Sequence, residues 1–373
     1  MADDTDTQRL VACLVADEAV IERFPAMVRY LLVGLFDEPA EVMLIVPDHP
    51  RAHTLVTGPI HVIPHRRPTW LGGHWVRQHV LASVRYRLDQ SKKDVGLIVH
   101  GLSLTTAPIA TSIASATGAD LVLNVTSTTV LEDFENAHFL AQANALIAPT
   151  EGIARAIRES HAPRASLQVV PIGIVSENAP AAFSHPGKAP SLIYAGALRP
   201  DSGVDVLLRA VKHVLRDHPD LLVFISGKGP AETDLRALAA SLGLAQNVTF
   251  TGRLDRLRTA MRSADLFCLP AALPAFREEP IHALAAGLVL IAAEGCLCDG
   301  LVDGQNALLF RDRDEVGLAR QINHALDNPQ TSRSLAATGQ ALARSRHSVS
   351  RMIVESMRIY QELLRRRKTL PLA

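Results

Sequence analysis

The chain has 373 residues, and its 38 Lys and Arg residues balance its 38 Asp and Glu residues, so its formal net charge is zero. This balance, with a pI near 7.3, argues against a dedicated nucleic-acid-binding protein, because such a protein needs a basic surface to displace counterions from phosphates. At roughly 150 residues per domain, the length predicts two domains and an appendage. Apolar runs such as Val95 to Val99 are far shorter than the roughly 20 residues of a membrane-spanning helix, so none is predicted.

The N-terminal segment and the cysteines both indicate a cytoplasmic protein. Residues 1–9 are acidic and polar, whereas a secretory signal carries Lys or Arg before an apolar stretch. Cys13 and Cys268 lie within apolar runs that predict buried strands. Cys296 and Cys298 have no second pair at the spacing of a zinc site. We therefore expect free thiols, no metal and no cofactor.

The first half of the chain alternates short β-rich runs with stretches of helical period, which predicts a parallel sheet covered by helices. Thr150 suits the N-cap of the helix that follows it, and Thr129 with Glu132 has the spacing of a capping box. The predicted strands are Leu10 to Val15, Glu41 to Val46, His61 to Pro64, Val95 to Val99, Asp120 to Val125, Ala145 to Ala148 and Leu167 to Val170.

Residues 171–190 are rich in proline and glycine and predict an interdomain linker. A second alternating series follows and predicts a second doubly wound sheet. Its strands are Leu192 to Ala195, Leu221 to Ile225, Val248 to Thr251, Leu266 to Leu269 and Val289 to Ala292, and its helices are Val204 to Leu215, Glu232 to Leu242, Arg256 to Met261 and Ile281 to Ala286. Three more helices, at about 316–326, 332–343 and 349–367, end the chain.

Two glycine-bearing turns of the second half carry the most chemical information. Gly196 follows a predicted strand and Gly203 precedes the next helix, while Gly227 and Gly229 flank Lys228 at the next strand-to-helix turn. Backbone N–H groups and the helix dipole at such turns favour an anionic phosphate. Each glycine taken alone is more often only a turn residue.

Short motifs follow one another through residues 191–309, at Leu192–Leu198, Gly203–Ala210, Gly227–Pro230, Leu242–Leu244, Val248–Gly252, Ala264–Phe267, Ala285–Gly287 and Gly304–Leu309. Their order and spacing resemble the C-terminal domain of family 4 of the nucleotide-sugar-dependent glycosyltransferases, which are retaining enzymes of the GT-B fold. The resemblance implies an α/β protein with two Rossmann-type doubly wound domains facing an interdomain cleft. The domains would span residues 1–175 and 190–345, with a helix at 346–373 packing back on the first.

Several polar positions depart from the pattern of that family. The arginine and lysine that steady the donor diphosphate are here Ala197 and Ser202. The two glutamates that hold the donor fall on Pro274 and His282, and the N-domain histidine falls near Thr126. Losing a preorganised cation beside a departing phosphate costs on the order of 10²-fold or more in rate. These losses therefore bear directly on activity.

Nearby charges offer substitutes. Arg199, Lys228 and Arg253 lie in or after the glycine turns, and Glu278 and Glu279 precede Pro280, which fits the first turn of a helix. An ordinary solvated surface is the alternative explanation for each of them. The donor-binding candidates are Gly196, Arg199, Gly227, Lys228, Gly229, Arg253, Glu278 and His282, and the catalytic candidates are His100 and Glu279.

His100 is a candidate because it ends a predicted strand at the edge of the sheet, a position suited to acceptor contact or general-base work. The cluster of His61, His65 and His74 with Arg66, Arg67 and Trp70 suggests an acceptor-side patch. Arg365 to Lys368 suggests contact with anionic lipid head groups, with a solvated helix end as the alternative explanation.

The leading functional hypothesis is transfer of a hexose from a nucleoside-diphosphate sugar to a saccharide or lipid-linked acceptor, with retention and without a metal. The alternative is a non-catalytic scaffold or sensor that keeps the fold and lacks the charges for turnover. A third possibility is an enzyme that acts on sugar nucleotides without glycosyl transfer, such as an epimerase. We expect no nucleic-acid partner and at most peripheral contact with the inner face of the membrane.

Overall fold

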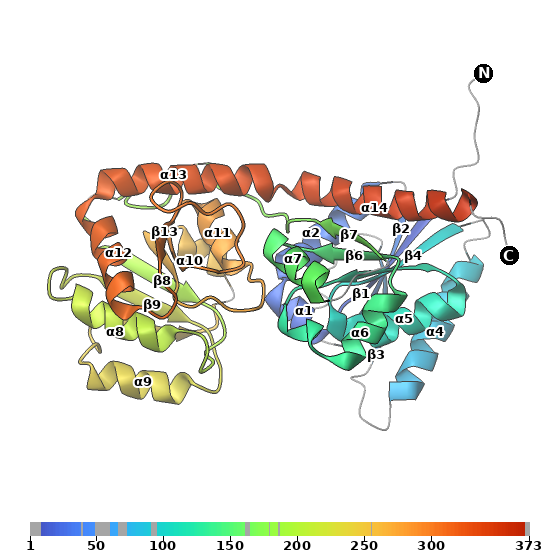
Figure 1. Ribbon diagram of the computed structural model, residues 1–373, viewed down its shortest axis with the longest axis horizontal. Coiled ribbons are helices and arrows are strands. Elements are labelled where there is room, and N and C mark those ends of the chain that lie inside the picture. The colour runs from blue at the N-terminus through green and yellow to red at the C-terminus, as the bar shows by residue number, and fades with distance from the viewer. Residues whose placement is uncertain are drawn as a thin grey trace, which may run out of the picture. The chain divides into compact units, whose positions relative to one another are not determined.

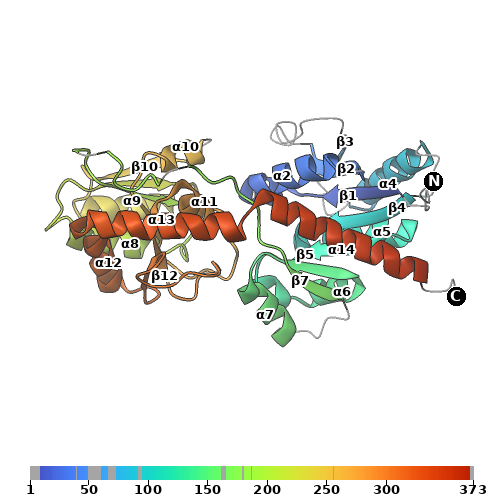
Figure 2. The same ribbon diagram turned by 90° about the horizontal axis from the view of Figure 1, so that it is seen from above.

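The computed structural model describes residues 9–38, 40–48, 60–65, 73–90, 95–160, 165–178, 180–185, 187–254 and 256–369. The chain divides into two compact units. Unit 1 takes the residues up to Gly173 together with those from Val349 onward, and unit 2 takes residues 174–348. Each unit is built around its own parallel sheet with helices on both faces (Figures 1 and 2).

The sheet of unit 1 has seven parallel strands in the order β3-β2-β1-β4-β5-β6-β7. Its central strands are buried along nearly their whole length, as expected of continuous apolar runs covered on both faces. The strands are β1 (Arg9–Val15), β2 (Ala40–Pro47), β3 (His61–His65), β4 (Val95–Gly101), β5 (Asp120–Asn124), β6 (Ala145–Ala148) and β7 (Ser166–Val169).

The helices of unit 1 include the C-terminal helix α14, which packs against α2. Figure 1 shows α2 and α14 on one side of the sheet and α4, α5 and α6 on the other. The approach of α14 depends on Gly34, because a Cβ at this position would collide with Ile353. The helices are α1 (Glu18–Arg23), α2 (Pro25–Phe36), α4 (Gly73–Gln90), α5 (Ala107–Thr117), α6 (Phe134–Gln142), α7 (Glu151–Ser160) and α14 (Val349–Thr369).

The sheet of unit 2 has six parallel strands in the order β10-β9-β8-β11-β12-β13. The order reverses at β8, so the crevice beyond the carboxyl ends of β8 and β11 is where an open α/β sheet binds its ligand. The strands are β8 (Ser191–Ala195), β9 (Leu222–Ser226), β10 (Val248–Gly252), β11 (Leu266–Leu269), β12 (Val289–Ala293) and β13 (Leu308–Phe310).

The helices of unit 2 cover both faces of that sheet, with α8 and α9 below it and α11 and α13 above it in Figure 1. The core between them includes the fully buried side chains of Tyr194 and Leu207, and each such side chain contributes about 1.5–3 kcal/mol by its burial. The helices are α8 (Val204–Val214), α9 (Glu232–Ser241), α10 (Leu257–Met261), α11 (Glu279–Ala286), α12 (Glu315–Asp327) and α13 (Pro329–Arg346).

Much of the segment predicted as a linker packs on unit 2. The backbone N–H groups of Glu177 and Ala181 donate to the carbonyl oxygens of Ala285 and Ala286, both at the end of α11. Asp265 holds the end of the segment, because its carboxylate accepts hydrogen bonds from the backbone N–H groups of Phe183 (2.7 Å) and Ser191 (2.9 Å). The segment that begins at Ile174 therefore belongs to unit 2.

Local predictions of helix starts had mixed outcomes. Thr150 caps α7 as predicted, because the Ile153 N–H donates to its Oγ1 at 3.3 Å. The capping box at Thr129 is wrong: this residue is the first residue of a short 3₁₀ helix, Thr129–Leu131, and not the N-cap of an α-helix. Its hydroxyl and its backbone N–H contact Ser127 Oγ instead, at 2.8 and 3.3 Å. Short polar side chains favour such local turns over helix starts.

Candidate functional site

Three loops meet at the carboxyl ends of the strands of unit 2, and their backbones are in contact. The Leu198 N–H donates to the carbonyl oxygen of Lys228 at 3.0 Å, which joins the loop after β8 to the loop after β9. A Cβ on Gly227 would collide with the carbonyl oxygen of Gly196, and one on Gly203 would lie 2.8 Å from the carbonyl oxygen of Pro270. These glycines therefore allow the loops to pack closely above the sheet.

Arg277, on the loop after β11, is a charged residue of this region that was not among the sequence-predicted candidates. Only 12% of its side chain is exposed, and its Nε lies 3.5 Å from Glu279 Oε2. Its Nη2 donates to the carbonyl oxygen of Ala195, the last residue of β8. Its guanidinium carbon lies 5.3 Å from the centre of the Tyr194 ring. The positive charge is thus held against the end of the central strand.

Buried polar atoms near this arginine have no hydrogen-bond partner among the described residues. They include Arg277 Nη1 and Ser202 Oγ. Ser202 is 2% exposed and immediately precedes Gly203, the N-cap of α8, which makes no side-chain cap bond. Burial raises the pKa of the Tyr194 hydroxyl, and Arg277 and Ser202 both act against that rise, so both lie beside the same phenol.

The acidic candidates begin α11. Glu278 is the N-cap, Glu279 is the first helical residue and Pro280 follows in the first turn, as predicted. The Glu278 side chain is 2% exposed and its Oε2 lies 3.6 Å from His282 Nε2. His282 Nδ1 is another buried atom without a partner in the described part of the chain. Glu279 is half-buried and pairs with Arg277.

The predicted substitute cations are more exposed than Arg277. Arg199 has 55% of its side chain exposed and forms two hydrogen bonds with Asp201, at 2.9 and 3.1 Å. Lys228 and Arg253 are both exposed, at the carboxyl ends of β9 and β10. The structure therefore brings all three to the same edge of the sheet, but it pairs Arg199 with a carboxylate and buries none of them.

His100 lies in the interior of unit 1, at 1% exposure. Its Nε2 lies 2.8 Å from Asn124 Oδ1, and its Nδ1 lies 2.6 Å from the hydroxyl of Tyr360 on α14. The amide oxygen can only accept, so the neutral ring donates from Nε2 and accepts at Nδ1. Burial lowers the pKa of His100 to about 4. Both ring nitrogens are thus hydrogen-bonded, and they connect β4 to Asn124 on β5 and to Tyr360 on α14.

The position expected from the family resemblance near Thr126 lies beside this histidine. Thr126 and His100 line one small cavity at the carboxyl ends of β4 and β5, together with Asn124, Met352 and Ser356. The structure therefore places the two candidate positions of unit 1 together, although they lie on different strands. This proximity follows from the parallel pairing of β4 with β5.

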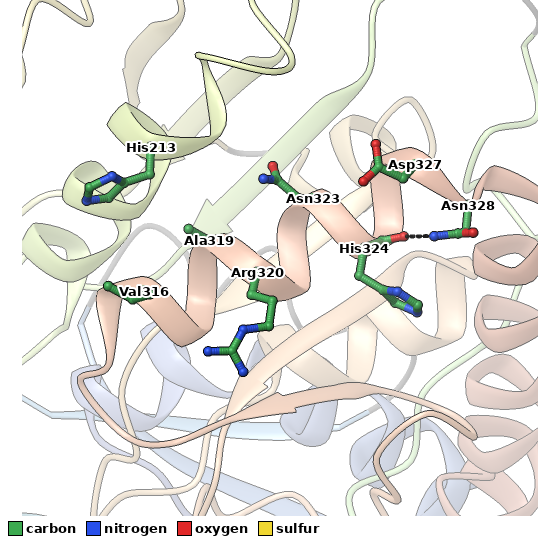
Figure 3. Close-up of a pocket in the computed structure, with 8 residues that line it drawn as sticks. All are labelled: His213, Val316, Ala319, Arg320, Asn323, His324, Asp327 and Asn328. Atoms are coloured by element: carbon green, nitrogen blue, oxygen red, sulfur yellow. Dashed lines mark hydrogen bonds between the residues drawn. The ribbon is translucent and has the colours of Figure 1, made fainter.

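Unit 2 has a larger pocket on its outer helices, shown in Figure 3. It lies along α12 and the end of α8, and it is lined by His213, Val316, Ala319, Arg320, Asn323, His324, Asp327 and Asn328. None of these lining residues is in the glycine loops. We therefore assign the candidate site to the strand ends and not to this pocket.

The basic clusters are only partly described. Arg66, Arg67 and Trp70 lie outside the described residues, as do the side chains of His74 and Lys368. His61 is half-buried beside Arg87 and Glu41, where burial first and Arg87 second lower its pKa. Within the described ranges, no group of three His, Cys, Asp or Glu residues could hold a metal ion, and no helix is long and apolar enough to cross a membrane. All four cysteines are free thiols.

Comparison with known proteins finds a family match in the second half of the chain. Residues 175–341 match the family model of glycosyl transferases group 1. This range covers the glycine loops, Arg277 and the start of α11, so the candidate site lies wholly within the glycosyl transferases group 1 match.

Relatives and solved structures extend this likeness. The chain is 32% identical over 227 residues to a D-inositol 3-phosphate glycosyltransferase of Streptomyces avermitilis, covering 55% of this chain and 48% of that protein. The chain thus spans about half the length of the curated relatives it matches. A glycosyltransferase structure from Rickettsia africae matches with a TM-score of 0.80 at 13% identity, covering 96% of this chain and 99% of that one. The structure of Anabaena Alr3699/HepE in complex with UDP and glucose matches with a TM-score of 0.75 at 17% sequence identity, and the match covers 94% of this chain and 99% of that one. The fold is therefore α/β of the GT-B type, as the sequence predicted.

The signal for Arg277 was present in the sequence but not specific. It directly precedes the two glutamates, in the loop after a predicted strand, where a buried arginine cannot be told from an exposed one. Arg277 lies on the loop after β11, whereas Ala195 ends β8. Only the hydrogen bond between these two residues shows that Arg277 is the arginine that lies against β8.

Proposed function

We propose that the protein transfers a hexose from a nucleoside-diphosphate sugar to a saccharide or lipid-linked acceptor, with retention of anomeric configuration and without a metal ion. The observation that carries the proposal is the glycosyl transferases group 1 match over residues 175–341. It coincides with a Rossmann-type sheet whose glycine loops lie at the switch point, where phosphates are bound.

The donor-binding residues follow from the loops. Gly196, Gly227 and Gly229 let the backbone approach a diphosphate, and Lys228 and Arg253 supply positive charge at the same edge. Glu278, Glu279 and His282 at the start of α11 offer carboxylates and a ring nitrogen for hydroxyl groups of the sugar or ribose. Arg199 is exposed and paired with Asp201, so we give it no direct part in holding the donor.

Chemically, the bond from the anomeric carbon to the phosphate oxygen breaks, and the oxygen keeps the electron pair. Positive charge and N–H groups held beside that oxygen stabilise the developing negative charge, and this is worth several kcal/mol when the groups are preorganised. The acceptor hydroxyl bonds to the anomeric carbon from the same face, and its proton passes to the departing phosphate oxygen. We give His100 no part in this step, because both its ring nitrogens are already hydrogen-bonded.

Titration calorimetry with UDP, GDP and ADP, with and without magnesium, tests the donor site before any acceptor is known. Binding of one nucleotide that does not depend on magnesium is the expected result. Slow hydrolysis of the matching nucleotide sugar, followed by NMR of the released sugar's anomeric signal, then tests turnover and retention. Failure of all three nucleotides to bind would refute the proposal.

A non-catalytic role is favoured by one observation, which is the neutralisation of Arg199 by Asp201 where a free cation would be most useful. The same experiments separate the two functions. Tight nucleotide binding with no hydrolysis of any nucleotide sugar and no transfer to a panel of saccharides would support a sensor, whereas hydrolysis or transfer would exclude it.

A further inference from the structure

We propose that Arg277 and Ser202 together bind the diphosphate group of the donor at the end of β8. This proposal rests on the proposed function and deepens it, because it assigns the principal cation of the donor site to a residue on the loop after β11. The ligand class is an anion with acceptor oxygens on adjacent phosphates, as in a nucleoside diphosphate or inorganic pyrophosphate.

The first argument is the incomplete pairing of a largely buried charge. Arg277 is 12% exposed, yet its carboxylate partner Glu279 meets only Nε, at 3.5 Å, which is a long contact for a charged pair. Nη2 is bonded to a neutral carbonyl oxygen, and Nη1 has no partner among the described residues. Because an unpaired charged donor is costly to bury, an incoming anion gains more at this guanidinium than at a solvated one.

A second buried polar group lies near Arg277 on a different loop, and it too lacks a hydrogen-bond partner among the described residues. Ser202 Oγ is also buried and unpaired, and it lies on a different loop from Arg277. Both residues act on the hydroxyl of Tyr194, so Ser202 and Arg277 lie near the same buried phenol. Ser202 stands one residue before the N-cap of α8, an 11-residue helix whose dipole favours negative charge at this end.

The third argument is steric. Gly196 leaves room for the guanidinium, because a Cβ at this position would collide with Arg277 Nη2. The same glycine lies beside Gly227, whose own Cβ would collide with the Gly196 carbonyl oxygen. The loops are thus packed around the arginine in the conformation that holds it against β8.

The exposed arginine of the same loop provides a matched control. Arg199 lies three residues from Ser202, but it is 55% exposed and its charge is balanced by two hydrogen bonds to Asp201. Exposed pairs of this kind contribute little to binding or stability. A diphosphate that relies on positive charge in general would respond equally to either arginine, whereas the proposed site responds to Arg277.

The test uses the full chain and four variants: Arg277→Gln, Arg277→Lys, Ser202→Ala and the control Arg199→Gln. Each is titrated with inorganic pyrophosphate, with UDP, GDP and ADP, and with uridine as a probe without phosphate. We expect Arg277→Gln to weaken binding of pyrophosphate and of the preferred nucleotide by roughly 10- to 100-fold, as for loss of a charge-assisted hydrogen bond. Ser202→Ala weakens both by roughly 3- to 10-fold, and Arg199→Gln stays within about 2-fold.

Arg277→Lys distinguishes a forked guanidinium from a point charge, and it should retain part of the affinity. Thermal unfolding of each variant checks its folding. If Arg277→Gln does not fold, Ser202→Ala decides the matter, because it removes a single oxygen atom and leaves the Tyr194 hydroxyl its hydrogen bond to the Ala197 carbonyl oxygen.

The outcomes separate this inference from the proposed function. Unchanged affinity in both Arg277→Gln and Ser202→Ala, with sugar transfer intact, overturns the inference and leaves the function. Binding of pyrophosphate that depends on Arg277, without nucleotide binding, supports the anion site and refutes the nucleotide-sugar function. A wild-type protein that binds neither pyrophosphate nor any nucleotide overturns both.

Discussion

His100 should make unit 1 less stable in mild acid, and the effect should disappear when the imidazole is replaced. The ring is 1% exposed, and its neutral form is paired with Asn124 and Tyr360. Burial is the main cause that lowers its pKa, from 6.5 to about 4, with the Asn124 hydrogen bond acting in the opposite direction. The perturbation is His100→Gln, which cannot titrate in this range.

The sign and size follow from proton linkage. The unfolded chain binds a proton at this residue below about pH 6.5, whereas the folded chain does so only near pH 4, so stability present above pH 6.5 is lost as the pH falls. Between pH 7.5 and pH 5 the loss from this one group is about 2 kcal/mol, and its limit at lower pH is about 3 kcal/mol, since each pKa unit corresponds to about 1.4 kcal/mol. Because the two units need not unfold together, a single global transition is the wrong probe.

Hydrogen exchange of backbone amides in β4 and α14 measures the relevant opening free energy. Between the two pH values it should fall by about 2 kcal/mol more in the wild-type protein than in His100→Gln, because the other titrating groups cancel in this difference. His185→Gln, at an exposed histidine of unit 2, should keep the wild-type dependence. Equal pH dependence in wild type and His100→Gln, or an NMR titration of His100 near pH 6.5, would refute the reasoning.

Three further predictions concern packing. Tyr360→Phe leaves His100 Nδ1 buried without its partner and should lower the free energy of opening of α14 by about 1–3 kcal/mol, measured by hydrogen exchange. Asp265→Ala removes the acceptor of two backbone N–H groups and should cost about 2–4 kcal/mol in urea unfolding of unit 2, whereas a cost below about 0.5 kcal/mol would contradict its role. Gly227→Ala should lower the melting temperature far more than Gly304→Ala, because both glycines have positive φ but only the first also meets a backbone oxygen.

The strands of this chain and the helices of unit 2 could be predicted almost completely because their signals are local. Parallel strands buried on both faces are continuous apolar runs, and Gly or Pro marks nearly every boundary between elements. The exceptions are short. β13 (Leu308–Phe310) was not predicted, since three residues give no periodicity, and Thr129 misled because a capping-box spacing also suits a local turn.

Of the candidate site, the sequence predicted the local geometry of the glycine turns and of the start of α11, because that geometry depends on neighbouring residues. The charged side chains of the site were harder to predict, because a sequence does not show which Arg or Lys side chain is buried. Nothing in the sequence distinguishes Arg199 from Arg277. In the structure Arg199 is exposed and pairs with Asp201, whereas Arg277 donates a hydrogen bond to the carbonyl oxygen of Ala195.

The sequence by itself thus determined two parallel α/β units, their loops and the resemblance of the second unit to glycosyltransferases, because apolar period and glycine spacing are properties of the chain alone. Only the tertiary structure decided the burial and the hydrogen-bond partners of His100 and Arg277. Tyr360 lies 260 residues from His100 in the chain, and Ala195 lies 82 residues from Arg277. Burial and pairing across such separations arise when strands and helices assemble, and they set which polar groups are left to meet a ligand.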